Sequence, residues 1–314
     1  MSYKEKYRQW CSREDVPLFL QAWWLDVACS QGKQWNVLLH EKDGLILASL
    51  VFHYVRKFGF QMILLPELTP YSGWWFAKSV SEQDKPAIAQ ELLLKLERLQ
   101  FDYMQISLVP ELVGLKEMLE KQSFDCRQRR TFVIKDISDP ESVFNQFHLS
   151  KRRHIQKAEK TLKVKEIGVS EFCRFHAQQY EQKGEKDLYS NNLLMTICNT
   201  SIKRQQGKIL AIMDEKGIVH AATFVVWDKL SAYYLLYCIN PQQRSSGAST
   251  MMVYEMIKYL QDKTQSFDFE GGMEDNVADS YSKFGTQEIH YCYAEKFNSK
   301  LLKFLFKLYH KKSL

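Results

Sequence analysis

The stretch from Ser231 to Gly285 limits the possible fold of this chain most, because strand, loop and helix patterns follow one another there. Residues 231–240 form an apolar run typical of a buried strand, and residues 250–260 have the apolar spacing of a helix. The loop between them, 241–249, is rich in small and polar residues. Such a loop lets several backbone N–H groups point at one anion, and the helix dipole adds a favourable potential.

The sequence therefore predicts a phosphate-binding loop after this strand. Glycine and alanine are expected there because a larger side chain would hold a phosphate away from the backbone. An ordinary turn followed by a polar helix cap would give a similar pattern. The residues predicted to bind the phosphate are Gln243, Arg244, Ser245, Ser246, Gly247, Ala248 and Ser249.

The rest of the chain alternates helices with strands and restarts its order near residues 138–140. Strands in 36–71 are predicted to turn at Lys42-Asp43-Gly44 and near Phe58-Gly59, and a hairpin in 207–228 turns at Glu215-Lys216-Gly217. Strand 266–272 and helix 278–285 follow the loop. This order predicts a mixed α/β protein with two domains, 1–138 and 139–314.

The charge of the chain is unevenly distributed. Residues 1–140 contain 18 basic and 18 acidic residues, so the whole formal net charge of +6 lies in the remainder. A polyanionic ligand such as a nucleotide, a lipid-linked phosphate or an RNA would be drawn to that half.

Several features point to a cytoplasmic protein without a metal. The N-terminus has no apolar signal core, and no run of about 18 apolar residues could span a membrane. The seven cysteines are scattered without a CxxC pair, which is typical of reduced thiols. No pair of histidines has metal-ligand spacing with other ligands, so no metal is expected.

The order of strand, small-residue loop, helix, strand and tyrosine-bearing helix resembles the GNAT acyltransferase superfamily. In that family, a loop of the pattern Gln/Arg-x-x-Gly-x-Gly/Ala holds the pyrophosphate of acyl-coenzyme A. Arg244, Gly247 and Ser249 occupy those positions here. A later family pattern is matched by Asn276, Ala278, Tyr281 and Gly285.

A narrower resemblance, to the Fem-type aminoacyltransferases, covers most of the chain. It rests on LSKRRHIQKAEK at 149–160, FDFEGGM at 267–273 and the restart of a second similar half. It implies two tandem GNAT-like domains with a cleft between them, the first on the acceptor side and the second binding the donor. Fem-type enzymes use aminoacyl-tRNA to extend bacterial cell-wall precursors, whereas relatives use acyl-coenzyme A or an acyl carrier protein.

The resemblance therefore implies an N-acyltransferase that moves an acyl group from acyl-coenzyme A, with acetyl-coenzyme A expected first, to an amine or hydroxyl of a cell-envelope or metabolite acceptor. One alternative is an aminoacyl-tRNA-dependent enzyme acting on a peptidoglycan precursor. Another is a non-catalytic binding protein that keeps the fold.

Acyl transfer to an amine needs a base for the attacking nitrogen and a proton for the leaving group. Asp268 and Glu270 would share one face of strand 266–272, opposite two phenylalanines. We expect Glu270 to be the general base, unless its carboxylate orders the neighbouring loop. Tyr281 matches the family position of the general acid; a core tyrosine is the alternative.

Three further segments are candidates for binding. Arg153 and Lys157 lie at helical spacing and would contact phosphate or tRNA, although a solvated basic face is common. The aromatic segment 69–77 would form an acceptor wall at the cleft through Tyr71, Trp74 and Trp75, or would pack between the two halves. The C-terminal helix is cationic and amphipathic, so it would dock onto the body or contact a membrane peripherally. The acceptor would be a small or lipid-linked molecule.

Overall fold

The computed structural model describes residues 2–29, 34–184 and 189–311 and divides into two compact units. Unit 1 comprises residues 1–129 and 290–314, and unit 2 comprises residues 130–289. The expected boundary at 138/139 differs from this division, because the end of the chain returns to unit 1. Strand β12 (Gln287–Phe297) pairs antiparallel with strand β5 (Tyr103–Ser107), which belongs to the first part of the chain.

Unit 1 is a mixed sheet with the order β1-β2-β3-β5-β12, and β4 also pairs with β2. Strands β1, β2 and β3 form an antiparallel meander, whereas β3 and β5 are parallel. The two predicted turns of this meander are confirmed: Asp43, Gly44, Phe58 and Gly59 all have positive φ, as tight hairpin turns require. Helix α3 contacts β1 and β2.

Strands β6 and β12 each contain residues of both units. With these two strands included, the described elements of unit 1 are α1 Tyr3–Cys11, η1 Leu18–Leu20, α2 Ala22–Ala28, β1 Gln34–Lys42, β2 Leu45–Lys57, β3 Phe60–Leu64, β4 Gly73–Phe76, α3 Lys85–Glu97, β5 Tyr103–Ser107, η2 Pro110–Leu115, α4 Lys116–Lys121, β6 Asp125–Ile134, β12 Gln287–Phe297 and α11 Lys300–Lys311.

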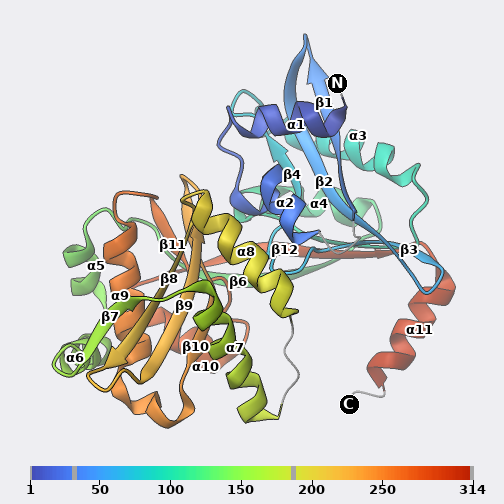
Figure 1. Ribbon diagram of the computed structural model, residues 1–314. Coiled ribbons are helices and arrows are strands. Elements are labelled where there is room, and N and C mark those ends of the chain that lie inside the picture. The colour runs from blue at the N-terminus through green and yellow to red at the C-terminus, as the bar shows by residue number, and fades with distance from the viewer. Residues whose placement is uncertain (1, 30–33, 185–188, 312–314) are drawn as a thin grey trace. The chain divides into compact units, whose positions relative to one another are not determined.

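Unit 2 is a mixed sheet with the order β6-β11-β10-β9-β8-β7. Strands β7 to β10 are antiparallel, and β10 and β11 are parallel. Helix α9 contacts β8, β9 and α6. Helix α7 contacts β10, and helix α8 contacts β8 (Figure 1). Each unit thus has an antiparallel meander, a crossing helix and then a parallel strand, as the repeated order in the sequence predicts.

The bounds of the other described elements of unit 2 are as follows: α5 Pro140–Gln146, α6 Leu149–Ala158, β7 Leu162–Glu166, α7 Val169–Lys183, α8 Asn191–Lys203, β8 Gly207–Asp214, β9 Val219–Trp227, β10 Ser231–Ile239, η3 Pro241–Ser246, α9 Ala248–Leu260, β11 Ser266–Asp268 and α10 Asp275–Ser282.

Candidate functional site

Strands β10 and β11 run together for only three residue pairs and then separate. Their pairing begins at Ser231 with Ser266 and ends at Tyr233 with Asp268. Strand β10 continues to Ile239 alongside β9, with an irregularity after Tyr233. The β11-facing edge of residues 234–239 therefore has no strand partner among the described residues. An open strand edge offers backbone N–H and C=O groups to an extended ligand.

A pocket of about 670 Å³ lies along this part of β10 in unit 2. It combines residues of α7, β10, the following loop and α10, so several elements converge on one cavity. Arg244 and Ser249, two of the predicted phosphate ligands, are in its wall. Its lining residues are His176, Gln179, Tyr180, Tyr189, Leu235, Leu236, Tyr237, Ile239, Arg244, Ser249 and Asn276.

The predicted phosphate loop is more ordered than its sequence indicates. Pro241 to Ser246 form the 3-10 helix η3, and Gly247 has φ 81° where η3 meets α9. The side-chain oxygen of Ser246 accepts from the N–H of Ala248 at 3.3 Å. Gln243, Ser245, Ser246, Gly247 and Ala248 are outside the pocket lining, and Ala248 is buried in the core.

The requirement for glycine at 247 comes from packing against α6. A Cβ atom added to Gly247 would lie 2.7 Å from the carbonyl oxygen of His154. The close approach at this position is thus between two helices, and it explains the glycine without any ligand. Arg244 and Ser249 are the members of the loop that face the pocket.

Glu270 lies where β11 has ended and the backbone turns away. Strand β11 stops at Asp268, and Glu270, Gly271 and Gly272 all have positive φ, so the predicted strand 266–272 is shorter than expected. The loop is ordered by Asp268, whose Oδ1 accepts from the N–H of Glu270 at 2.7 Å and from the hydroxyl of Thr131. The Glu270 carboxylate itself has no hydrogen-bond partner among the described residues.

Burial raises the pKa of the Glu270 carboxyl well above its usual range, and the neighbouring Asp268 charge raises it further. The first effect arises because a buried carboxylate loses its hydration, and the second because like charges repel. A partly buried, unpartnered carboxyl group with a raised pKa is a stronger base than a solvated carboxylate, which makes Glu270 a candidate general base.

Tyr281 packs on the phenylalanines of the core of unit 2. Its ring centroid lies 4.5 Å from that of Phe269 and 6.2 Å from that of Phe132. Burial raises the pKa of the Tyr281 hydroxyl, and Tyr237, Tyr234 and Glu270 raise it further. Tyr281 is a core tyrosine and also a neighbour of both Tyr237, which lines the pocket, and Glu270.

The sequence patterns did not identify Tyr237 as a site residue. Its side chain is 45% exposed, in a strand whose other central residues are buried, and its ring stacks on Tyr234 with centroids 5.3 Å apart. The irregularity in β10 places it in the pocket wall, and simple alternation along residues 231–240 gives no sign of that irregularity.

Arg153 and Lys157 are exposed on α6, next to the start of α9. Neither forms an ion pair with a described residue, so both cations are available to an external anion. Lys151, two residues before Arg153, is different: its Nζ donates to the hydroxyl of Ser280 at 3.0 Å and lies 4.2 Å from the ring centre of Phe284. Burial and then Lys283 lower the pKa of Lys151 to about 8.

The aromatic segment of unit 1 is mostly core. Tyr71 is 2% exposed and Trp74 0% exposed. The ring centroids of Tyr71 and Tyr291 lie 5.3 Å apart. Gly73 to Phe76 form β4, which pairs with β2. The structure thus places Tyr71 and Trp74 in packing within unit 1, and only Trp75 of the three is partly exposed.

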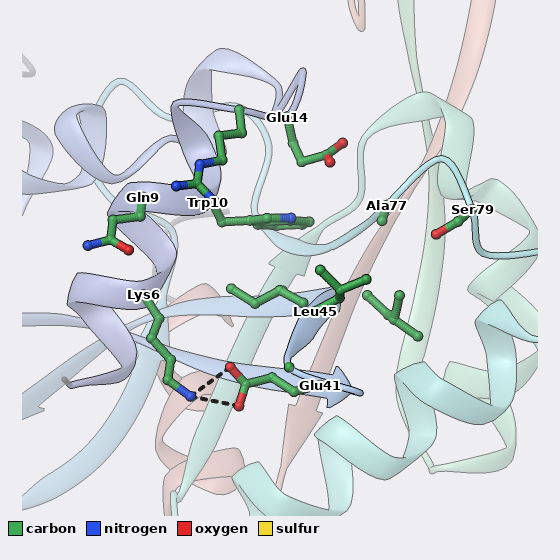
Figure 2. Close-up of a pocket in the computed structure, with 12 residues that line it drawn as sticks. Lys6, Gln9, Trp10, Glu14, Glu41, Leu45, Ala77 and Ser79 are labelled. Atoms are coloured by element: carbon green, nitrogen blue, oxygen red, sulfur yellow. Dashed lines mark hydrogen bonds and ion pairs between the residues drawn. The ribbon is translucent and has the colours of Figure 1, made fainter.

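Unit 1 has a separate, smaller pocket of about 290 Å³ between α1 and the β1–β2 hairpin (Figure 2). Trp10 and Leu45 line it, and Lys6 pairs with both oxygens of Glu41 at 2.9 Å. None of the residues predicted from the sequence to bind or react is in its wall.

No group of three or more histidine, cysteine, aspartate and glutamate side chains in 2–29, 34–184 and 189–311 could hold a metal ion. Within the same ranges, no helix is long and apolar enough to cross a bilayer.

Comparison with known proteins identifies the domain that contains the pocket. Residues 148–276 match the acetyltransferase (GNAT) domain family. No curated protein matches the chain in a sequence comparison.

Solved structures match the fold of nearly the whole chain. A crystal structure of FemX has a TM-score of 0.72 at 12% identity, covering 93% of this chain and 96% of that one. A tandem GNAT protein from the clavulanic acid biosynthesis pathway has a TM-score of 0.58 at 7% identity, covering 95% and 94%. L-PGS from Bacillus licheniformis has a TM-score of 0.56 at 14% identity, covering 96% and 94%.

The GNAT match lies within unit 2 and includes β10, the loop after it and α9. Residues 148–276 therefore resemble GNAT acetyltransferase domains, and the chain as a whole has the two-domain fold of the tandem GNAT and FemX-type proteins.

Proposed function

We propose that this protein is an N-acyltransferase that acts in the cytoplasm and moves an acyl group from acyl-coenzyme A to an amine or hydroxyl of a cell-envelope or metabolite acceptor. The observation that carries the proposal is the pocket beside the open edge of β10. Arg244 and Ser249 lie in its wall together with Tyr237, and Tyr281 is a neighbour of both that tyrosine and Glu270.

The donor would lie along β10 with its phosphates toward α9. Arg244 supplies a permanent positive charge, and the hydroxyl of Ser249 and the first N–H groups of α9 supply donors at the positive end of a helix. The unpaired backbone groups of 234–239 would hydrogen-bond the extended arm of the donor, as an added strand does. The remaining lining residues leave room for the acyl group.

The reaction would use two neighbouring residues, Glu270 and Tyr281. The acceptor nitrogen attacks the thioester carbonyl, and Glu270 takes the proton from that nitrogen, directly or through water. Tyr281 carries its proton at neutral pH, as tyrosines ordinarily do, so its hydroxyl can donate that proton to the leaving thiolate. The raised pKa of Glu270 makes that carboxylate a stronger base than a solvated one.

Acetyl-coenzyme A is the first donor to test. It should raise the melting temperature of the protein in proportion to the logarithm of its concentration. Tyr281→Phe should keep the fold and this increase in melting temperature, yet slow acyl transfer to a panel of amine acceptors, measured as release of free coenzyme A thiol, by roughly 10²-fold or more. The control is Tyr3→Phe, at an exposed position of unit 1. The proposal fails if acyl-coenzyme A species neither bind nor stabilise the protein.

The exposed cations of α6 support a second candidate, an aminoacyl-tRNA-dependent aminoacyltransferase that extends a peptidoglycan precursor. Arg153 and Lys157 have no ion-pair partner among the described residues, and the fold is that of FemX. Binding of charged tRNA that weakens steeply with salt, and that Arg153→Ala with Lys157→Ala abolishes, would favour this donor. A folded protein that binds a donor without transferring its acyl group would instead be a binding module.

A further inference from the structure

The C-terminal helix α11 has three different sides. Its positions repeat every 3.6 residues, so residues three and four apart share a side. One side, with Leu302 and Phe306, is docked on unit 1. Another carries apolar residues that are exposed, and the third carries lysines.

The docked side is narrow. Leu302 is 4% exposed and clusters with Met62 and Tyr103, and Phe306 packs against the same cluster. The ring centroid of Phe306 lies 5.1 Å from that of Tyr103. These contacts fix the rotation of α11 about its axis, so the other two sides face away from unit 1.

The exposed apolar side is unusually large for a single short helix. Leu301 is 60% exposed, Phe304 57%, Leu308 44% and Leu305 42%. Docking onto the body of the protein therefore accounts for only part of the apolar surface of this helix. Contiguous exposed apolar residues of this kind mark a surface that binds something.

The lysine side borders the apolar side over residues 300–308 of α11. Lys300, Lys303 and Lys307 are exposed, and none of them forms an ion pair with a described residue. The sequence of α11 contains no acidic residue. A helix with an apolar stripe beside a purely cationic one complements an anionic surface that is apolar beneath its charges.

The turn between β2 and β3 repeats this chemistry beside α11. Phe58 at its tip is 86% exposed with φ 53°, and Lys57 Nζ lies 5.5 Å from the centre of its ring. Arg56 is exposed as well. Strand β3 begins two residues later and its Phe60 belongs to the cluster that holds α11, so the turn and the helix adjoin one surface (Figure 1).

We propose that α11 and the β2–β3 turn together form a membrane-binding surface for anionic lipids, with Phe304, Leu308 and Phe58 entering the acyl boundary and the lysines contacting the headgroups. A second copy of this chain is a poorer occupant, because pairing two such helices would bring lysines together without any acidic residue. The surface does not depend on which donor unit 2 binds, and it would bring a lipid-linked acceptor to the enzyme.

Co-sedimentation of the full chain with phospholipid vesicles tests the proposal without an acyl donor. We expect binding to vesicles that contain phosphatidylglycerol, weaker binding to pure phosphatidylcholine, and a decline with salt. Phe304→Ser combined with Leu308→Ser should weaken binding at least about tenfold, and each of Lys303→Gln and Lys307→Gln about fivefold. Phe58→Ser should weaken it as well.

Val113→Ser is the matched control, because Val113 is 48% exposed in unit 1 yet belongs to η2, which is not part of this surface. It should leave binding unchanged. The proposal is overturned if anionic vesicles do not bind the protein, if the Phe304 and Leu308 variant binds them as tightly as the wild type, or if sedimentation velocity shows self-association that this variant abolishes. Acyl transfer measured in solution reports separately on the proposed function.

Discussion

The carboxylates of Glu270 and its neighbour Asp268 differ in their hydrogen bonding. Asp268 is 4% exposed, and its Oδ1 accepts hydrogen bonds from the N–H of Glu270 and from the hydroxyl of Thr131. Glu270 is thereby held in a left-handed conformation with its own carboxylate unpartnered. Backbone strain of this kind persists only where the surroundings impose it, and it is common at reactive sites.

The pKa of Glu270 leads to a prediction about stability. Because its pKa is raised in the folded state, the folded protein holds this proton more tightly than the unfolded chain does. Stability should therefore fall as the pH rises from the ordinary glutamate range through the raised pKa. Glu270→Gln should remove this decline and stabilise the protein at pH 8 by on the order of 1 kcal/mol.

Thermal unfolding at several pH values measures this effect, with Glu215→Gln in the exposed β8–β9 turn as the control. If Glu270→Gln and the wild type lose stability in parallel between pH 5 and 8, the carboxylate is not the strained group inferred here. The same variant should slow acyl transfer if Glu270 is the base, so that it would gain stability while losing activity.

Among the elements, η3 and α9 show how helix packing shapes the donor loop. Gly247 joins them in a left-handed conformation directly against the carbonyl of His154. Gly247→Ala should destabilise the protein by about 1 to 3 kcal/mol. The alanine would strain the left-handed backbone, and its Cβ would be too close to the carbonyl oxygen of His154, so α6 would have to shift. The measurement is denaturant unfolding.

Gly217→Ala separates these two causes. Gly217 has φ 80°, almost the value at Gly247, yet a Cβ there would meet no atom within 4 Å. It should suffer the backbone strain alone and lose less stability than Gly247→Ala. Equal losses in the two variants would show that the contact with α6 contributes nothing.

The sequence predicted elements better than it predicted how their ends are built. The order from β10 to α10 and the turns at Gly44, Gly59 and Gly217 follow from local patterns, because periodicity and turn residues act over a few positions. Strand β11 is shorter than its alternation indicated, since a pattern of side chains does not reveal the positive φ of Glu270. Arg244 and Ser249 could be inferred as pocket residues, whereas Tyr237 depends on an irregularity in pairing with β9.

At the scale of the whole molecule, the chain leaves unit 1 in β6 and returns to it in β12. Composition and restarted order could not predict this return, because pairing between β5 and β12 joins residues about 190 positions apart. Such long-range contacts leave no local signal. Unit 2 is continuous, whereas unit 1 needs both ends of the chain.

This connectivity predicts which fragments of the chain fold on their own. Residues 130–289 should fold alone and keep the donor pocket, because its lining residues all belong to this segment. Residues 1–138 should not fold, because they lack β12, whose Cys292, Tyr293 and Ala294 are buried, and Leu302 of α11. Joining 1–129 to 290–314 through a flexible Gly/Ser linker should restore a cooperative transition.

Circular dichroism with thermal melting distinguishes these fragments. A cooperative transition in 1–138 alone would show that unit 1 folds without β12. The boundary between the two domains would then lie near residue 138.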